Sequence, residues 1–375
     1  MLFNVCALYI KIMNNENQTI HKSDDNLTIY GWNEKLNQLK QESIYSTLAH
    51  GRVSIVHRTC YEVISGNGLF QCELTGNMMY GKSDDELPCT GDWVIFQPFD
   101  EHKGIIVDRL PRERTLYRKK SGTVADKQAI ASYVDKAFIV QSLDDNFNVR
   151  RVERFMVQIM EENISSVLVL NKADLDFDRQ SVEEQIKHIS SQIPVFFTSI
   201  HQLETIVRLR KSISEGETVV FVGSSGVGKS SLVNALCEKP VLLTSDISLS
   251  TGKGRHTSTR REMVLMDSSG VLIDTPGVRE FGVAIDNPDS LAEVLEISDY
   301  AELCRFKDCK HINEPGCAVI EAVNSGALDS KVYASYLKLR REAWHFSSSE
   351  HEKRKKEKSF TKLVEEVKNR KDASR

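Results

Sequence analysis

Short apolar runs separated by turn residues mark the chain between residues 50 and 110. They lie at 51–56, 70–74, 91–96 and 104–107. Short strands with turns between them predict a small β-barrel, and five strands would suit an OB-fold.

Further along the chain, apolar runs are followed by polar loops that contain candidate ligand-binding residues. The runs at 166–170, 218–222 and 271–273 read as buried strands. Ligands of parallel α/β sheets bind at the ends of such strands. A doubly wound α/β sheet is therefore predicted after the barrel.

The run 218–222 is followed by Gly-Ser-Ser-Gly-Val-Gly-Lys-Ser and then by a helix-forming run, which fits the phosphate-loop pattern Gly-x4-Gly-Lys-Ser/Thr. Backbone N–H groups of residues 224–229 would surround the β-phosphate, Lys229 would reach the β- and γ-phosphates, and Ser230 would bind Mg²⁺. The alternative is a glycine-rich turn without a ligand. The predicted contacts are Gly223, Ser224, Ser225, Gly226, Val227, Gly228, Lys229, Ser230 and Ser231.

A guanine-reading motif, Asn-Lys-Ala-Asp at 171–174, ends the run 166–170. A carboxylate at Asp174 can accept from two neighbouring donors, as guanine N1–H and N2–H₂ present, whereas adenine has an acceptor at N1 and no 2-amino group. Asn171 would brace the loop, and the Lys172 stem would lie along the face of the base. The alternative is a turn that only ends a strand.

A third motif, Asp-Thr-Pro-Gly at 274–277, follows the phosphate loop by about 50 residues and ends an apolar strand. Asp-x-x-Gly alone is too common to indicate a function. Its position here, at the end of a strand and downstream of the phosphate loop, is what makes it a candidate switch motif. Asp274 can hold the Mg²⁺ shell through water, and the Gly277 N–H can contact the γ-phosphate.

The order of these motifs is unusual. GTPases generally run phosphate loop, switch I, Asp-x-x-Gly and then Asn-Lys-x-Asp, but here the guanine motif and a possible base loop at 198–200, with Ser199, come first. This order predicts a circular permutation, which a doubly wound sheet tolerates when its original termini lie close together.

Cysteine spacing predicts a metal site downstream. Cys304, Cys309, His311 and Cys317 form Cys-x4-Cys-x-His-x5-Cys. Four such ligands within 14 residues match a closed tetrahedral zinc site, which leaves no position open for catalysis. A redox pair and a chance spacing are the alternatives. The other cysteines are scattered, as small core residues would be.

Charge is distributed unevenly. Residues 331–375 carry 14 Lys/Arg and 7 Asp/Glu, a local charge of +7 in a chain whose formal charge is −4. Such a tail suits a polyanion, although a solvated helix would also interleave Glu with Lys. No apolar run approaches a membrane span, and the N-terminus lacks a basic leader, so we expect a cytoplasmic protein.

Two further groups are candidates for RNA contact. Aromatic residues of the barrel could stack on bases, although they are more often core; they are Tyr61, Phe70 and Trp93. A basic run is a better candidate for phosphate contact, against the alternative of a solvated linker; it comprises Arg109, Arg112, Arg114, Arg118, Lys119 and Lys120.

With the permuted order, an upstream barrel and the downstream cysteine motif, the chain resembles the ribosome small-subunit-dependent GTPase A family (RsgA, also called YjeQ). The resemblance covers roughly residues 30–370. It includes Gly-Asp-Trp at 91–93, Gly-Arg-His-Thr-Ser-Thr at 254–259 and Asp-Thr-Pro-Gly-Val-Arg-Glu-Phe-Gly at 274–282.

The resemblance implies hydrolysis of GTP to GDP and phosphate, stimulated by the 30S ribosomal subunit, in late small-subunit maturation. The barrel and zinc domain would bind 16S rRNA, and release would follow hydrolysis. Cofactors would be GTP/GDP, Mg²⁺ and one structural Zn²⁺; no DNA or membrane partner is expected, and a monomer is the default.

Two positions in the switches bear on the mechanism. Val278 stands where many GTPases carry a Gln that orients water, so intrinsic turnover should be slow. His256 is the candidate replacement, against the alternative of an exposed loop histidine. Switch I reads Thr-Ser-Thr where three threonines are common, which leaves the Mg²⁺ ligand open between Thr257 and Thr259. Ile200 stands where Ala is usual.

The predicted organisation has four segments: an N-terminal extension with a short helix at 1–46, an OB-fold barrel at 47–118, a circularly permuted GTPase domain at 119–286, and a zinc-binding domain with a basic C-terminal helix at 287–375.

Two other functions stay open. One is an RNA-binding assembly module that uses guanine nucleotide only as a structural ligand, and the other is an ATPase.

Overall fold

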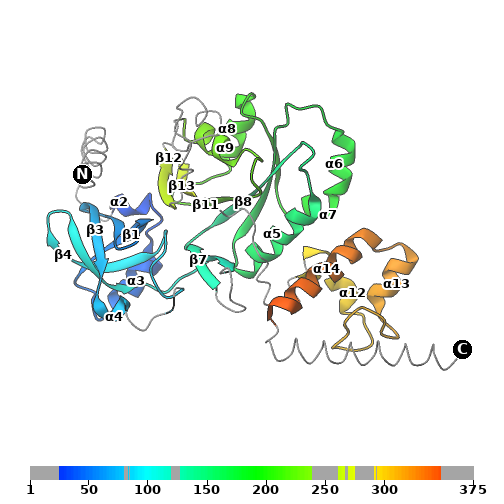
Figure 1. Ribbon diagram of the computed structural model, residues 1–375, viewed down its shortest axis with the longest axis horizontal. Coiled ribbons are helices and arrows are strands. Elements are labelled where there is room, and N and C mark those ends of the chain that lie inside the picture. Colours follow the sequence, from blue (N-terminus) through cyan, green and yellow to red (C-terminus); the bar gives the residue numbers. More distant parts are fainter. Residues whose placement is uncertain are drawn as a thin grey trace, which may run out of the picture.

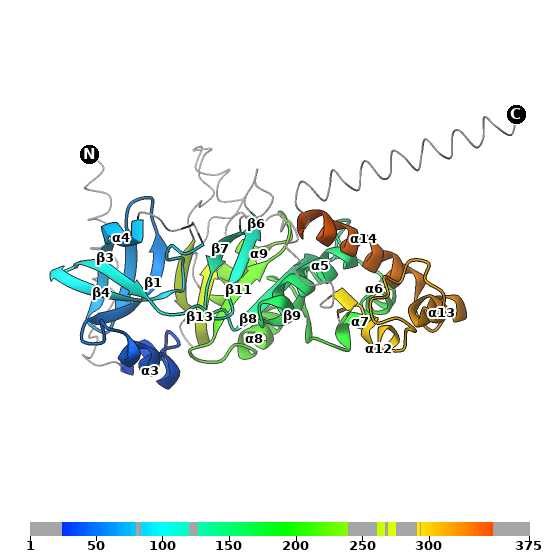
Figure 2. The same cartoon turned by 90° about the horizontal axis from the view of Figure 1, so that it is seen from below.

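Three parts follow one another along the longest axis of the molecule: a barrel, an α/β sheet covered by helices, and a helical region (Figure 1). Figure 2 shows the same order from below. The computed structural model describes residues 25–79, 83, 85–119, 127–238, 261–266, 269–274, 291–292 and 294–347.

The barrel has five strands, as predicted. Strand β1 pairs with both β2 and β4, and the order β1-β2-β3-β5-β4 closes the sheet on itself with only β3 and β5 parallel. The apolar runs missed β2, in which buried and half-buried residues alternate. The strands are β1 (Ala49–Val56), β2 (Tyr61–Ser65), β3 (Gly68–Leu74), β4 (Trp93–Asp100) and β5 (Lys103–Arg109).

The three aromatic residues considered for base stacking are core residues. Tyr61 and Phe70 pack inside the barrel, and Trp93 packs outside it against Trp32, whose ring centroid is 4.8 Å away. All three are at most 8% exposed. The stacking hypothesis is therefore wrong for them, because no base could reach their faces.

Short helices flank the barrel. Helix α3 (Glu34–Glu42) buries Leu36 beside Trp93, and the Asn33 side chain caps it by accepting from the Leu36 N–H at 3.1 Å. The other two are α2 (Asp25–Thr28) and α4 (Gly76–Met79).

The α/β sheet is doubly wound, as predicted. Its order is β10-β9-β8-β11-β13-β12, in which β12 alone is antiparallel to its neighbour. Its fully buried strands read as continuous apolar runs because helices cover both faces. The strands are β8 (Lys136–Ser142), β9 (Ser165–Asn171), β10 (Val195–Thr198), β11 (Thr218–Val222), β12 (Glu262–Met266) and β13 (Ser269–Asp274).

The helices form two separate cores with the sheet. Residues of α5 (Val149–Glu161) and α7 (Lys187–Ser190) pack on one face, while residues of α8 (Leu203–Lys211) and α9 (Lys229–Leu236) pack on the other. Helix α6 (Arg179–Gln185) contributes Val182 to the first core.

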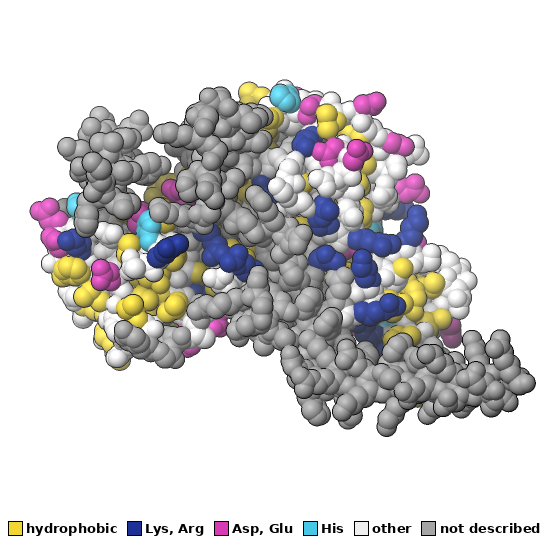
Figure 3. Space-filling model, in the orientation of Figure 1, with side chains coloured by type: hydrophobic (Ala, Val, Ile, Leu, Met, Phe, Trp, Pro, Cys, Tyr) yellow, Lys and Arg dark blue, Asp and Glu magenta, His cyan; other side chains and the backbone are white. Residues whose placement is uncertain are grey.

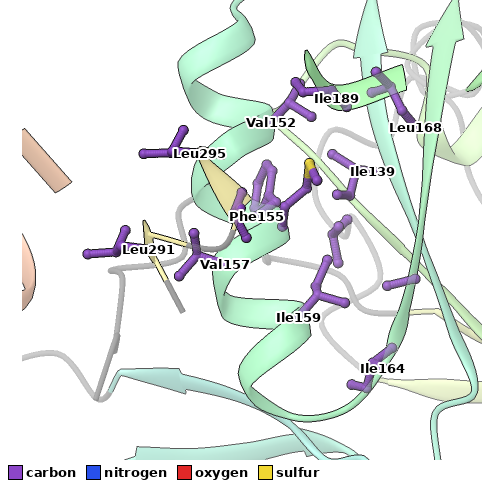
Figure 4. Close-up of a cluster of buried hydrophobic side chains, with 14 of the residues drawn as sticks. Ile139, Val152, Phe155, Val157, Ile159, Ile164, Leu168, Ile189, Leu291 and Leu295 are labelled. Carbon is purple, nitrogen blue, oxygen red and sulfur yellow. The ribbon is translucent and has the colours of Figure 1, made fainter. Parts of the chain in front are cut away.

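The first of these cores extends into the helical region. Leu291, Val294 and Leu295 are fully buried members of this core, and Leu291 and Leu295 lie beside α5 near Phe155 and Val157 (Figure 4). The same core continues into three helices that the structure describes in this region. They are α12 (Ser298–Ala301), α13 (Ala318–Ser325) and α14 (Ser330–Ser347). The described stretch around Leu291 and Leu295 is thus anchored on α5.

A buried carboxylate also joins α5 to the helical region. Glu153, which is 3% exposed, accepts from Ser335 Oγ of α14 at 2.5 Å, and its second oxygen lies 3.0 Å from His188 Nε2 of α7. A buried carboxylate needs such partners, since an unpaired charge would be costly.

Arg52 of β1 fastens the barrel to the α/β sheet. Its guanidinium, 1% exposed, donates to Gly91 O at 2.9 Å, Tyr30 O at 2.5 Å and Thr218 Oγ1 at 2.9 Å. Burial lowers the pKa of Arg52 to about 10. This value is still well above neutral pH, so the guanidinium remains charged. The two sheets also meet directly, because Ile55 pairs with Glu262 of β12.

A hairpin connects the two parts along the chain. Strands β6 (Leu116–Lys119) and β7 (Lys127–Ala131) pair antiparallel, and β7 lies between the barrel and α5 in both views (Figures 1 and 2). Across the parts of the chain that the structure describes, every helix is too short or too polar to cross a membrane.

Candidate nucleotide and metal sites

The phosphate loop and the guanine motif lie at the same edge of the sheet. Asn171 ends β9 level with Ser142 of β8 and Thr198 of β10, and the phosphate loop leaves β11, the next strand after β8. Parallel strands bring their carboxyl ends to one edge, where α/β sheets bind ligands. The permuted chain thereby assembles its motifs in one place.

The phosphate loop has the backbone of a ligand cradle. Gly223, Gly226 and Gly228 have φ values of 150°, 83° and 90°, conformations that favour glycine. Gly228 is the N-cap of α9, so the N-terminus of the helix opens toward the loop. Lys229 Nζ donates to Gly223 O at 2.7 Å and Ser224 O at 2.6 Å, which places the ammonium at the loop itself.

Asn171 ties the guanine motif to the phosphate loop. Its Nδ2 donates to Val227 O at 2.9 Å, and its Oδ1 accepts from Thr198 Oγ1 at 3.2 Å. Asn171 is 3% exposed. The amide therefore joins the loop that would bind phosphate to both loops that would bind the base.

Gly228 and Gly226 make a matched pair for testing this contact. A Cβ at Gly228 would lie 2.4 Å from Asn171 Nδ2, whereas a Cβ at Gly226 would meet nothing within 4 Å. We expect Gly228→Ala to weaken GTP binding at least about 100-fold, because it adds a clash to the backbone strain, and Gly226→Ala to lose about tenfold through strain of roughly 1–2 kcal/mol. Equilibrium titration with a fluorescent GTP analogue measures both, and equal losses would contradict the role given to the contact.

The predicted base loop holds Asp174. Ser199 Oγ donates to Asp174 Oδ1 at 2.5 Å, and this hydrogen bond lowers the pKa of Asp174. Ser199 is itself fixed, since its N–H donates to Thr205 Oγ1 at 3.0 Å. Asp174 is exposed, so an ionised carboxylate stands ready at the predicted base position.

Lys172 has a partner that the sequence did not indicate. Its Nζ donates to Asp144 Oδ2 at 2.7 Å, and Ser142 Oγ donates to the other oxygen at 2.6 Å. Partial burial opposes the charged form of Asp144, but the hydrogen bonds from Lys172 and Ser142 outweigh it and lower its pKa to about 2. Asp144 thus fixes the lysine whose stem would lie along the base.

The switch positions are described only in part. Asp274 ends β13 and pairs with Glu262 of β12. His256, Thr257, Thr259 and Gly277 lie outside the described residues.

The predicted metal ligands come together. Nδ1 of His311 lies 3.5 Å from Cys304 Sγ and 3.4 Å from Cys317 Sγ, and these two sulfur atoms are 3.9 Å apart. With Cys309, all four ligand atoms lie within 4.8 Å of one another. Ligands of a tetrahedral zinc ion would be separated by about 3.6 Å for nitrogen to sulfur and about 3.8 Å for sulfur to sulfur, given the usual bond lengths. The four side chains therefore fit such an ion.

Neighbouring groups fix the loop of this metal site. Tyr333 Oη of α14 donates to His311 O at 2.6 Å. Glu314 accepts from the backbone N–H groups of Lys310, Ile312 and Asn313 at 2.9–3.1 Å. The ligands thus sit on a loop held by α14 and by its own backbone.

Several side chains of the basic run make structural contacts within the protein. Arg112 is bound to buried Asp92, with Nη2 and Oδ2 2.7 Å apart, and Arg114 Nη2 lies 3.0 Å from Asp135. Arg109 donates to Leu110 O at 3.2 Å. Arg118 has no carboxylate partner among the described residues, while the Lys119 side chain and Lys120 lie outside them.

A cavity of about 370 Å³ lies at the opposite end of the α/β sheet, where α3, the barrel and the start of β11 meet. Most of its charged groups are paired with one another, with Lys136 or with backbone. Arg52 is hydrogen-bonded as described above, Arg114 pairs with Asp135, and Glu217 pairs with Lys136 at 2.8 Å. The cavity is remote from the phosphate loop. Its walls are formed by residues at the junction between the barrel and the α/β sheet.

Comparison with known proteins follows this geometry. The family model described as RsgA GTPase matches residues 109–284. An ABC transporter model matches residues 206–369, a range that contains the phosphate loop but not Asn171–Asp174. Phosphate loops occur in both ATP- and GTP-binding proteins, so the second match does not indicate which base is bound.

Relatives match nearly the whole chain. "Small ribosomal subunit biogenesis GTPase RsgA 1" of Bacteroides thetaiotaomicron is 75% identical over 96% of this chain and 99% of its own length. The RsgA protein of Methanosarcina acetivorans is 37% identical over 87% of this chain and 89% of its own.

Solved structures agree with the fold. The crystal structure of YjeQ from Thermotoga maritima has a TM-score of 0.61 at 26% identity, and covers 79% of this chain and 98% of that one. YloQ, described as a circularly permuted GTPase, has a TM-score of 0.59 at 21% identity over 80% of this chain and 97% of its own, and supports the fold alone. The chain belongs to the RsgA family of small ribosomal subunit biogenesis GTPases.

Proposed function

We propose that this protein hydrolyses GTP to GDP and phosphate during maturation of the small ribosomal subunit, and that the 30S subunit stimulates the reaction. The observation that carries the proposal is the Asn171 amide, which joins a phosphate loop to an Asp174 loop across permuted segments. Relatives of near-equal length that are named small ribosomal subunit biogenesis GTPases supply the biological setting.

The nucleotide would lie along the sheet edge, with its base at Asp174 and its phosphates at the loop. Asp174 would accept from guanine N1–H and N2–H₂, Lys172 would cover one face of the base, and the backbone N–H of Ile200 would approach the remaining edge. Lys229 would exchange its hydrogen bonds to Gly223 O and Ser224 O for contacts with the phosphates. Ser230 would bind Mg²⁺, and Asp274 would lie in the outer coordination shell of the ion. Bound Mg²⁺ would neutralise charge that develops on the phosphates.

The water-positioning group would come from switch I. Val278 can neither donate nor accept, so His256 takes the role that a Gln has elsewhere. We expect His256→Ala to lose 30S-stimulated turnover by at least about 100-fold while GTP affinity stays within about twofold, measured by phosphate release and nucleotide titration. Full stimulated turnover in this variant would assign the water to another residue.

The four-ligand cluster would hold one structural Zn²⁺, because three thiolates and an imidazole suit zinc.

The helical region and the barrel would contact 16S rRNA as parts of a monomeric protein. Lys and Arg side chains spread across one face from the barrel to the helical region support this contact (Figure 3). The domains would span residues 1–46, 47–118, 119–286 and 287–375.

Phosphate release tests the proposal directly. Zinc-loaded protein is assayed with GTP and with ATP, each with and without purified 30S subunits. We expect strong stimulation by 30S that is confined to GTP. Binding to 30S without stimulation would instead favour an RNA-binding module with a structural nucleotide, and turnover of ATP would favour an ATPase.

A further inference from the structure

Asp144 lies beside the proposed base site, although no nucleotide-binding motif contains it. It lies just beyond the end of β8, and its Oδ2 accepts from Lys172 Nζ at 2.7 Å across 28 positions of the chain. The two strands also meet there, because Ser142 is level with Asn171 and the Leu143 N–H donates to Asn171 O at 2.9 Å. The carboxylate is therefore a neighbour of the guanine motif.

The Asp144 side chain is itself held in place. Its Oδ1 accepts from Ser142 Oγ at 2.6 Å and from the Asn146 N–H at 3.0 Å. Its backbone carbonyl accepts from the Phe147 N–H at 2.9 Å, and Ser142 is fully buried. A side chain supported in this way can orient another one. Asp144 is therefore a fixed partner for Lys172.

The backbone of Lys172 is held as well as its ammonium group. Its φ of 62° lies in the left-handed region, which a residue with a side chain rarely adopts. Such a conformation persists where the surroundings hold it. Here the Leu175 N–H donates to Lys172 O at 3.1 Å, and the Ala173 N–H donates to Thr198 O at 2.9 Å. The lysine stem thus lies between a fixed Cα and an Nζ fixed by Asp144.

We propose that Asp144 is a positioning residue for nucleotide binding, and that it holds the Lys172 stem in place for the guanine ring before the nucleotide arrives. Ordering one long side chain during binding lowers affinity by about two- to tenfold, and a stem that is already ordered avoids this loss. Guanine and its analogues present similar faces to the stem. Asp144 therefore raises affinity, whereas Asp174 selects the base. The proposal rests on the function proposed above.

Asp144→Asn removes the charge and keeps the size of the side chain, and Asp145→Asn is the matched control at the next, exposed residue. Removing a carboxylate near a polyanionic nucleotide should by itself favour binding. We therefore expect Asp145→Asn to bind GTP as tightly as the unmodified protein, or up to about twofold more tightly. Asp144→Asn should instead bind GTP and GDP about three- to tenfold more weakly, as measured by titration and competition with a fluorescent GTP analogue.

Tighter binding by Asp144→Asn would overturn the proposal, because the carboxylate would then withhold Lys172 from the nucleotide. Equal affinities in Asp144→Asn and Asp145→Asn would overturn it too, since the ion pair would have no effect on binding. Thermal unfolding checks that each variant is folded.

Lys172→Met tests whether the effect passes through the lysine. Methionine keeps an unbranched apolar stem but cannot pair with Asp144. The double variant Asp144→Asn/Lys172→Met should bind GTP within about twofold of Lys172→Met alone, because the ion pair is already absent. A further loss as large as that of Asp144→Asn in the unmodified background would show that the carboxylate acts through another group, and would overturn the proposal.

Two measurements distinguish positioning from a general distortion of the site. The ratio of GTP affinity to that of inosine triphosphate (ITP), which lacks the 2-amino group, should be unchanged in Asp144→Asn, because Asp174 contacts that edge of the base. In the presence of 30S subunits, KM for GTP should rise by about three- to tenfold while kcat stays within about twofold, since the stem supports the ground state and the transition state equally. A changed ratio, or a larger fall in kcat, would indicate distortion and overturn the positioning role.

Failure of the proposed function would look different. It fails if the unmodified protein binds no guanine nucleotide or shows no stimulation by 30S, whatever the variants do. If the unmodified protein passes both tests and Asp144→Asn behaves as Asp145→Asn does, only the role of Asp144 is lost.

Discussion

Asp174→Asn is expected to change the preferred nucleotide from GTP to xanthosine triphosphate (XTP). The asparagine amide would present an N–H donor where guanine also presents donors, while the xanthine carbonyl at C2 would accept from it. Sites built to pair with a polar edge reject a mismatched one by about 10⁴-fold. We therefore expect GTP affinity to fall by about 10³-fold or more and XTP affinity to rise, as measured by competition against a fluorescent nucleotide.

Asp176→Asn is the matched control for this change. It removes the same charge two residues further along, at an exposed position. We expect it to bind GTP as tightly as the unmodified protein. If Asp174→Asn still preferred GTP, or if Asp176→Asn lost as much affinity, Asp174 would not be the residue that recognises the base.

Removing the zinc ion that we propose for the four-ligand cluster is expected to unfold the helical region. Zinc binding supplies about 10–16 kcal/mol in small zinc peptides, which equals or exceeds the whole stability of a typical domain. Cys309→Ser should therefore lose the bound ion and lower the melting temperature by more than about 10 °C. Metal content and thermal unfolding, each with and without a chelator, measure the two effects.

The effect should extend beyond the metal loop. Cys317 and Val319 belong to the same core as Phe155 of α5, so loss of the helical region would uncover part of the α/β sheet as well. Cys60→Ser, at a half-buried cysteine in the barrel, is the control and should keep both zinc and stability. Equal zinc content in the two variants would contradict the ligand assignment.

The sequence predicted those features that a short stretch of chain can encode. A phosphate loop, a guanine motif and a four-ligand metal loop each combine residue type with fixed spacing, and buried parallel strands appear as continuous apolar runs. The circular permutation followed from motif order alone. Each motif needed at most about 15 consecutive residues, and the permutation needed only the order of the motifs along the chain.

Contacts between distant residues were not predictable in this way. The hydrogen bond from Asn171 to Val227 joins positions 56 residues apart, and that from Arg52 to Thr218 joins positions 166 apart. Neither has a periodic signature, and an arginine within a strand pattern is normally expected at the surface. The aromatic candidates were wrong for a related reason, because pattern alone does not distinguish a stacking face from a core side chain.

The buried Arg52 sets an order for how the protein is completed during synthesis. Its partner Thr218 emerges from the ribosome 166 residues later, which takes between about 8 and 33 s at about 5–20 residues per second. The barrel can close around its own core during this delay, and Arg52 can already donate to Gly91 and Tyr30, but the N–H group that later meets Thr218 keeps water as its partner. The junction therefore becomes final only when the strand that carries the phosphate loop has been made, so a nascent chain acquires its two-part architecture and its nucleotide site almost together.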